Sequence, residues 1–115
     1  MTAVLLDVGV LLQSCGGDED FARELFGEYQ QRVNELVQVM HKALQDKQPE
    51  EIRKAAHELK GSSLTLGATE MAHISRTLED GIKAGQTTQL IEWVTTLETQ
   101  AGLLFAHLKT LSYLE

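Results

Sequence analysis

The chain is poor in several residue types that whole functional classes require. Its 115 residues include one cysteine, one proline and one tryptophan. A single thiol, Cys15, can form neither an internal disulfide nor a multi-cysteine metal site, so we expect a reducing, cytoplasmic setting. No low-complexity tract is present, and nothing reads as an interdomain linker. The sequence therefore predicts one domain over residues 1–115, a length that can bury one core.

Positive charge is also scarce. Ten Lys and Arg residues stand against 17 Asp and Glu residues, for a formal net charge of −7. This balance disfavours binding to nucleic acid and to anionic membrane surfaces. No segment approaches the ~18 apolar residues that a membrane span needs. The N-terminal run Val4, Leu5 and Leu6 is too short for a signal peptide and lacks a basic segment before it. We therefore expect a soluble protein with a protein partner or a small ligand.

Apolar residues recur at three- and four-residue spacings along most of the chain, which predicts helices. Asp7 and Asp18 are suitable N-caps, and Gly67 and Gly85 are suitable stops. Gly81 should weaken the helix that contains it. No sustained two-residue alternation is present, so no strand is predicted. The expected helices cover residues 8–14, a long segment after Asp18 as far as the loop at 45–48, and then 49–66, 69–85 and 88–114.

The four longer segments predict an all-α fold, an antiparallel up-down-up-down four-helix bundle with a short extra N-terminal helix that caps one end. A bundle of this size can bury its own apolar stripes, so we expect a monomer. The last helix has a near-heptad stripe, a pattern that also supports dimers. Its members are Leu90, Val94, Leu97, Ala101, Leu104, Leu108 and Leu111.

The segment 49–66 carries the residues with the most distinctive chemistry. At ~100° per residue, its two sides separate clearly. One side should face the core and consists of Ile52, Ala55, Ala56, Leu59, Ser63 and Leu66. The other side consists of Arg53, Lys54, His57, Lys60, Gly61 and Leu64. His57 is therefore expected to point into solvent, among three cations in an otherwise acidic protein.

This exposed side suits phosphoryl transfer. A neutral imidazole is a nucleophile that can form a phosphohistidine. Lys60, one turn away, offers a point charge to phosphoryl oxygens. Gly61 lowers helix stability by ~0.5–1 kcal/mol relative to alanine, which makes sense if another molecule must approach His57 closely. Leu64 suits a docking surface, and Arg53 and Lys54 could steer an acidic partner.

The run from Ala56 to Ser63, Ala-His-Glu-Leu-Lys-Gly-Ser-Ser, resembles the phosphorylation motif of the histidine-containing phosphotransfer family. The pairs Gly67-Ala68 and Leu78-Glu79 and the helix starts near Asp7 and Asp18 fit the family's layout as well. The resemblance implies a four-helix bundle whose exposed histidine receives a phosphoryl group from a receiver-domain aspartate and passes it to another. It maps the phosphate acceptor to His57, the assisting lysine to Lys60 and the small residue to Gly61. Some members orient the histidine with a glutamine from the neighbouring helix, and here Glu79 occupies that region.

The resemblance also implies the partners, namely response-regulator receiver domains and a hybrid sensor histidine kinase. No glycine-rich nucleotide loop or kinase signature is present, so we expect no autophosphorylation from ATP. We expect the chain to need no cofactor, and we expect any Mg²⁺ to sit on the carboxylates of the partner receiver.

Two other functional classes compete with a phosphorelay. One is a non-phosphorylated interaction module that binds a protein through the face around His57 and Leu64. The other is a carboxylate-rich metal bundle, for which Glu70 and His73 supply only one Glu-x-x-His pair where two are required. We therefore predict no metal site. The remaining histidines, His41, His73 and His107, are expected at the surface or at its boundary.

Overall fold

The structure is a computed structural model that describes residues 5–115. Residues 1–4, including Val4 of the N-terminal apolar run, lie outside the described residues. Within the described part, all regular structure is helical, and the prediction of an all-α fold is confirmed. No helix of residues 5–115 is long and apolar enough to cross a membrane. The helices are α1 (Val8–Ser14), α2 (Glu19–Gln45), α3 (Pro49–Leu66), α4 (Thr69–Lys83) and α5 (Leu90–Thr110).

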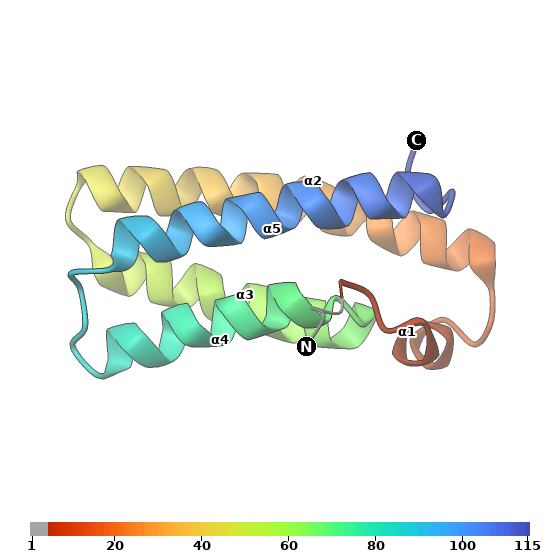
Figure 1. Cartoon of the computed structure of the whole chain (residues 1–115), viewed down its shortest axis with the longest axis horizontal. Coiled ribbons are helices and arrows are strands. Elements are labelled where there is room, and N and C mark those ends of the chain that lie inside the picture. Colours follow the sequence, from red (N-terminus) through yellow and green to blue (C-terminus); the bar gives the residue numbers. More distant parts are fainter. Residues whose placement is uncertain (1–4) are drawn as a thin grey trace.

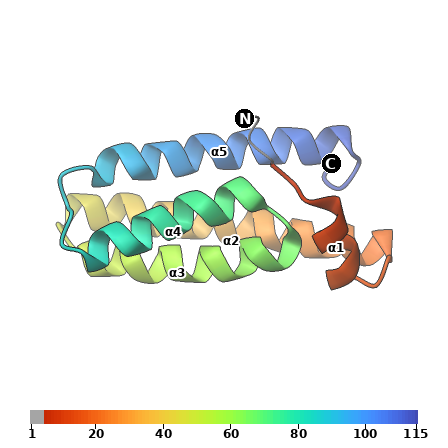
Figure 2. The ribbon, with the colours of Figure 1, turned by 60° about the horizontal axis from the view of Figure 1, so that its bottom comes forward.

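The four long helices form the predicted antiparallel bundle (Figure 1). α3 packs between α2 and α4, and α5 closes the bundle by packing against both α4 and α2. The short α1 lies at the end of the bundle where α3 gives way to α4 (Figure 2). There the Ser14 hydroxyl donates a hydrogen bond to the backbone carbonyl of Thr65 in α3. The extra N-terminal helix therefore caps one end of the bundle, as predicted.

Helix boundaries follow the local signals in the sequence. The side chain of Asp7 accepts a hydrogen bond from the amide of Val10 at 3.2 Å, and Asp18 accepts one from the amide of Phe21 at 3.1 Å. α3 begins with Pro49, which needs no partner for an amide proton at that position. It ends at Gly67, whose φ of 76° lies in the left-handed region that glycine adopts readily. These features fix the length and register of α3.

The core consists of the predicted apolar stripes. On α3, all six residues expected to face inward are buried. Ser63 is fully buried, and its hydroxyl lies 2.6 Å from the hydroxyl of Tyr29 in α2. Burial raises the pKa of Tyr29 to about 12, so this phenol stays neutral. The expectation that Ser63 faces the core is therefore confirmed, and the opposite side of α3 is left to face solvent.

The predicted bounds of the last helix are wrong at both ends. The periodicity predicted a helix over residues 88–114, whereas α5 spans Leu90–Thr110. The chain turns at Ser112, whose φ is 64°. The amide of Tyr113 then bonds back to the carbonyl of Leu108 at 2.9 Å. A residue in the left-handed conformation, followed by an amide that bonds back to the last turn, ends a helix. The helix ends there even though the apolar spacing continues beyond it.

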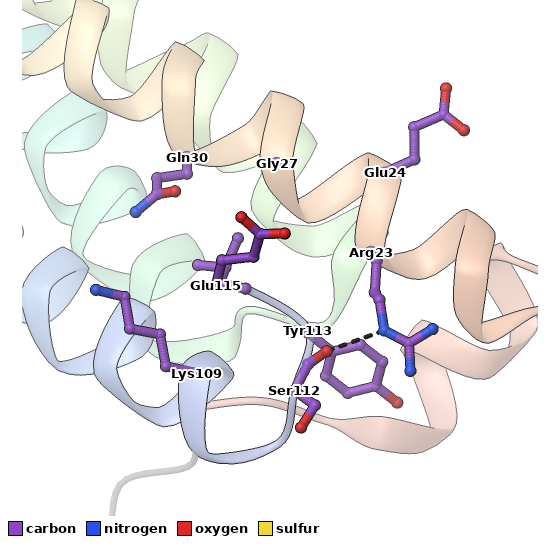
Figure 3. Close-up of a pocket in the computed structure, with 9 residues that line it drawn as sticks. Arg23, Glu24, Gly27, Gln30, Lys109, Ser112, Tyr113 and Glu115 are labelled. Carbon is purple, nitrogen blue, oxygen red and sulfur yellow. Dashed lines mark hydrogen bonds between the residues drawn. The ribbon is translucent and has the colours of Figure 1, made fainter.

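Tertiary contacts hold this turn. The Arg23 guanidinium of α2 donates from Nε to the carbonyl of Ser112 at 3.0 Å (Figure 3). The Tyr113 ring packs on Phe26, with the two ring centroids 5.5 Å apart. Leu111, which the stripe placed in the core, is instead 42% exposed. The C-terminal segment therefore folds back on α2 and does not prolong α5.

Gly81 of α4 has a packing role that sequence alone did not indicate. A Cβ atom at this position would lie 2.5 Å from two ring carbons of Trp93 in α5. The absence of a side chain thus lets the indole lie against the backbone of α4. Gly81 therefore provides the space in which the Trp93 indole packs on α4.

Candidate functional site

His57 lies on the solvent side of α3, as the helical periodicity predicted. Its side chain is 65% exposed. Gly61 and Leu64 are exposed on the same helix, and Lys60 is partly buried. The prediction about which side of α3 faces the core and which faces solvent is therefore confirmed.

Glu79 of α4 lies directly beneath this surface. Its side chain is only 1% exposed. Its Oε2 atom lies 2.5 Å from Nδ1 of His57, and its Oε1 atom accepts a hydrogen bond from Nζ of Lys60 at 2.6 Å. Nζ of Lys83, one turn further along α4, is 3.8 Å from the same Oε2 atom. The structure thus brings His57, Lys60 and Glu79 together, and adds Lys83.

The electrostatic state of Glu79 follows from these contacts. The hydrogen bond from Lys60 lowers the pKa of the carboxyl below its ordinary value of 4.5, and the contact with His57 lowers it further. Burial opposes both effects without cancelling them. Glu79 is therefore an ionised, buried carboxylate at neutral pH. A buried charge of this kind is tolerated because hydrogen-bonding cations surround it.

The Glu79 carboxylate also fixes the tautomer of His57. An ionised carboxylate can only accept a hydrogen bond, so Nδ1 of the imidazole must carry the proton between them. In the neutral ring the other nitrogen, Nε2, then holds the lone pair. The ring is therefore anchored through Nδ1 to a buried group and has its nucleophilic nitrogen free.

Gly61 is not required by the packing of the bundle. Apart from its chain neighbours and the nearby backbone of α3, a Cβ atom built at this position has no heavy atom within 4 Å. A larger residue would therefore fit the free protein and improve helix propensity. The observation agrees with the idea that the space above Gly61 is needed by another molecule.

The three predicted docking residues differ in their surroundings. Leu64 is 58% exposed. Arg53 donates from Nε to Glu50 at 2.8 Å, and this contact raises the pKa of the guanidinium. Nζ of Lys54 lies 3.4 Å from Glu51. Both cations are therefore paired within α3, and the structure does not bring either of them onto His57.

The other histidines lie in different surroundings. Nε2 of His41 lies 3.1 Å from Glu98 of α5, and the His41 side chain is about half exposed. His73 and His107 are exposed, as expected. The pair Glu70 and His73 gains no further ligand, and no group of three metal-binding side chains occurs in residues 5–115.

Two clefts differ in their relation to His57. One, of about 410 Å³, runs between α3 and α4 and is lined by Lys60, Leu64, Glu79 and Lys83 among others. The other, of about 680 Å³, lies between α2 and the C-terminal segment and contains no residue of α3 or α4 (Figure 3). The cleft that belongs to the site is therefore the one along α4.

The sequence interpretation missed Lys83. The sequence does suggest a contact between Lys83 and Glu79, because residues four positions apart on one helix have neighbouring side chains. What could not be read from the spacing was that Glu79 is buried against His57.

Comparisons with known proteins agree with this geometry. The family model described as the Hpt domain matches residues 24–109. The crystal structure of histidine-containing phosphotransfer protein B from Pseudomonas aeruginosa PAO1 superposes with a TM-score of 0.87. That match has 25% sequence identity and covers 95% of each chain. A search of curated protein sequences gave no significant match.

Proposed function

Because the chain belongs to the Hpt domain family, whose members carry phosphoryl groups on histidine in phosphorelay signalling, we propose that His57 is its phosphate acceptor. Hpt domains act with receiver domains and kinases in two-component relays. On this proposal, His57 accepts the phosphoryl group from an aspartyl phosphate of one receiver domain and passes it to an aspartate of another. We take residues 1–115 as one phosphotransfer domain.

The reaction uses the free nitrogen of the anchored ring. Nε2 of His57 attacks the phosphorus atom of the aspartyl phosphate, and a nitrogen–phosphorus bond forms. The bond between phosphorus and the aspartyl oxygen breaks, and the aspartate leaves as a carboxylate. The imidazole becomes cationic and keeps its Nδ1 proton toward Glu79, so no proton is released. Transfer to the next receiver is the reverse reaction with a new aspartate.

The single observation that carries this proposal is the contact between Nδ1 of His57 and the buried Glu79 carboxylate. It holds the ring in one tautomer and leaves an exposed nucleophile. It also places a negative charge beside the cationic ring that the reaction creates, and preorganised charges of this kind lower reaction barriers. The surface histidine His41 also contacts a carboxylate, that of Glu98, but Glu98 is about half exposed, whereas Glu79 is buried.

The neighbouring residues have distinct proposed roles. Lys60 supports the phosphorylated site by holding Glu79 in its ionised form beside His57. Gly61 leaves room for the receiver to approach His57. Leu64 supplies apolar docking surface, and Arg53 and Lys54 form the charged edge of that surface.

The phosphoryl group should come from a partner. We infer that the chain is a carrier without kinase activity of its own, supplied through a hybrid sensor histidine kinase and its receiver domain. Mg²⁺ would be held by the carboxylates of the receiver. We also infer a cytoplasmic monomer that meets its partners transiently; light scattering at micromolar concentration should give the mass of one chain.

The proposal is tested by incubating the protein with a receiver domain that carries labelled aspartyl phosphate. We expect label on the chain that is stable in base and labile in acid, as a phosphohistidine requires, and no label from ATP alone. Stable binding to the receiver without any transfer of label would contradict the proposal and favour an interaction module.

A further inference from the structure

We propose that Arg32 of α2 is a positioning residue for phosphoryl transfer, because it holds the negative charge of Glu58 away from the reacting side of His57. This inference rests on the proposed function of His57. Glu58 directly follows the histidine on α3, so its carboxylate belongs to the surroundings that an incoming phosphoryl group meets. Arg32 thus affects the reaction although it lies on neither α3 nor α4.

Arg32 binds Glu58 through two nitrogen atoms of its guanidinium. Nε donates a hydrogen bond to Oε2 at 2.6 Å, and Nη2 donates one to Oε1 at 2.8 Å. Such paired, charge-assisted bonds fix the orientation of a carboxylate as well as its position. The same contact lowers the pKa of Glu58, so the carboxylate is ionised at neutral pH. Both of its oxygens are therefore engaged on the α2 side of α3.

The two carboxylates beside His57 differ in what they can do for the ring. Because α3 packs between α2 and α4, Glu79 contacts Nδ1 from one side, whereas Glu58 is held toward the other. Glu79 accepts the ring proton and is buried. The Glu58 side chain is 44% exposed, and in the neutral tautomer the remaining ring nitrogen has no proton to donate to it. Glu58 therefore cannot assist His57 as Glu79 does.

A free Glu58 carboxylate would hinder the reaction. Once released from Arg32, this half-exposed side chain can rotate toward the solvent side of α3, where Nε2 of His57 attacks. During transfer, negative charge spreads over the equatorial oxygens of the phosphoryl group, and the leaving group is itself a carboxylate. A further carboxylate nearby repels both anions. By holding Glu58 toward α2, Arg32 leaves the approach to His57 open to these anionic groups.

The exposure of this cluster indicates that it contributes little to the fold. Nη1 of Arg32 also donates to Glu35, three residues later on α2, at 3.1 Å. The side chains of Arg32, Glu35 and Glu58 are each about half exposed. Ion pairs as exposed as these add little to stability. Removing Arg32 should therefore change the charge near His57 without unfolding the bundle.

The test is a double-mutant cycle of Arg32→Gln, Glu58→Gln and the double variant, with Glu35→Gln as the matched control. Rapid mixing with a phosphorylated receiver gives the transfer rates. We expect Arg32→Gln to slow transfer by ~5-fold, and Glu58→Gln and Glu35→Gln to stay within ~2-fold of wild type. The double variant should also recover to within ~2-fold of wild type, because no Glu58 charge is left to be held. All variants should keep the wild-type helix content.

Salt provides a second readout. Exposed charges are screened at high ionic strength, so the defect of Arg32→Gln relative to wild type should shrink from low salt to ~1 M salt. A defect that does not depend on salt would overturn the inference. So would a double variant as slow as Arg32→Gln, wild-type transfer in Arg32→Gln, or an equal loss in Glu58→Gln. These results leave the proposed function intact as long as the wild-type chain is labelled, whereas failure to label the wild type would refute the proposed function.

Discussion

Nδ1 of His57 and Oε2 of Glu79 lie 2.5 Å apart although the two residues are separated by 22 positions and belong to different helices. The histidine is exposed on α3, whereas its partner is buried on α4. The packing of α3 against α4 is therefore part of the site. Substitutions in α4 that never touch a receiver should still change the chemistry at His57.

Replacing Glu79 by Gln tests the charge of this contact. The amide oxygen can still accept from His57, but it bears no charge to stabilise the cationic ring or to hold Lys60. We expect transfer to slow by ~10-fold while the helix content is unchanged. Rapid-mixing measurements with a phosphorylated receiver give the rate.

The matched control is Glu98→Gln. This substitution removes a carboxylate on α5 that contacts an exposed histidine on α2, His41, at 3.1 Å. That variant should transfer at the wild-type rate. Equal rates for Glu79→Gln and Glu98→Gln would contradict a role for the Glu79 charge.

Glu79 should also make the fold sensitive to acid. Its folded-state pKa is lowered, chiefly by Lys60, so the unfolded chain binds more protons than the folded chain as pH falls. The stabilisation is complete above the ordinary value of 4.5 and is lost as pH falls through the lower folded pKa. Urea unfolding from pH 7 to 3 should therefore show a steeper decline for wild type than for Glu79→Gln. Parallel curves would show that Glu79 contributes nothing to this dependence.

Gly61→Gln separates stability from partner access. Gly102 of α5 is the matched control, because a Cβ atom at either glycine meets nothing within 4 Å beyond its chain neighbours and its own helix backbone. Glutamine at each position should raise the free energy of unfolding by up to ~1 kcal/mol through helix propensity. Only Gly61→Gln should slow transfer, since only it intrudes above His57. Normal transfer in a stabilised Gly61→Gln protein would exclude the steric role.

Gly81→Ala tests the packing of α4 on α5. The added methyl group would lie 2.5 Å from ring carbons of Trp93, so either the indole or the two helices must move. We expect a loss of ~1–3 kcal/mol in the free energy of unfolding, as overpacking generally causes. Adding Trp93→Leu should recover part of this loss. Full stability of Gly81→Ala alone would contradict the close packing of the Trp93 indole on Gly81.

Local rules were sufficient for much of this fold. Caps such as Asp7 and Asp18 and the stop at Gly67 are set by neighbouring residues, so the spacing of the sequence identified them. The two sides of α3 follow from helix geometry alone, and the solvent position of His57 followed with them.

The features that sequence could not provide depend on contacts between distant segments. Two tertiary contacts determine where α5 ends: Tyr113 packs on Phe26, and Arg23 binds Ser112. The spacing of apolar residues does not indicate either contact. The sequence indicated only that Gly81 weakens its helix, whereas the structure shows that Trp93 packs against it. Lys83 gained significance only because Glu79 is buried beside His57.

The most direct test of the account is the labelling of His57→Gln by the same phosphorylated receiver that labels wild type. Glutamine cannot form a phosphoramidate through an imidazole nitrogen, and the exposed site should tolerate it within ~1 kcal/mol. We predict a folded His57→Gln protein with no acid-labile label, and wild-type labelling of His41→Gln, His73→Gln and His107→Gln. Acid-labile label remaining on folded His57→Gln would contradict the account.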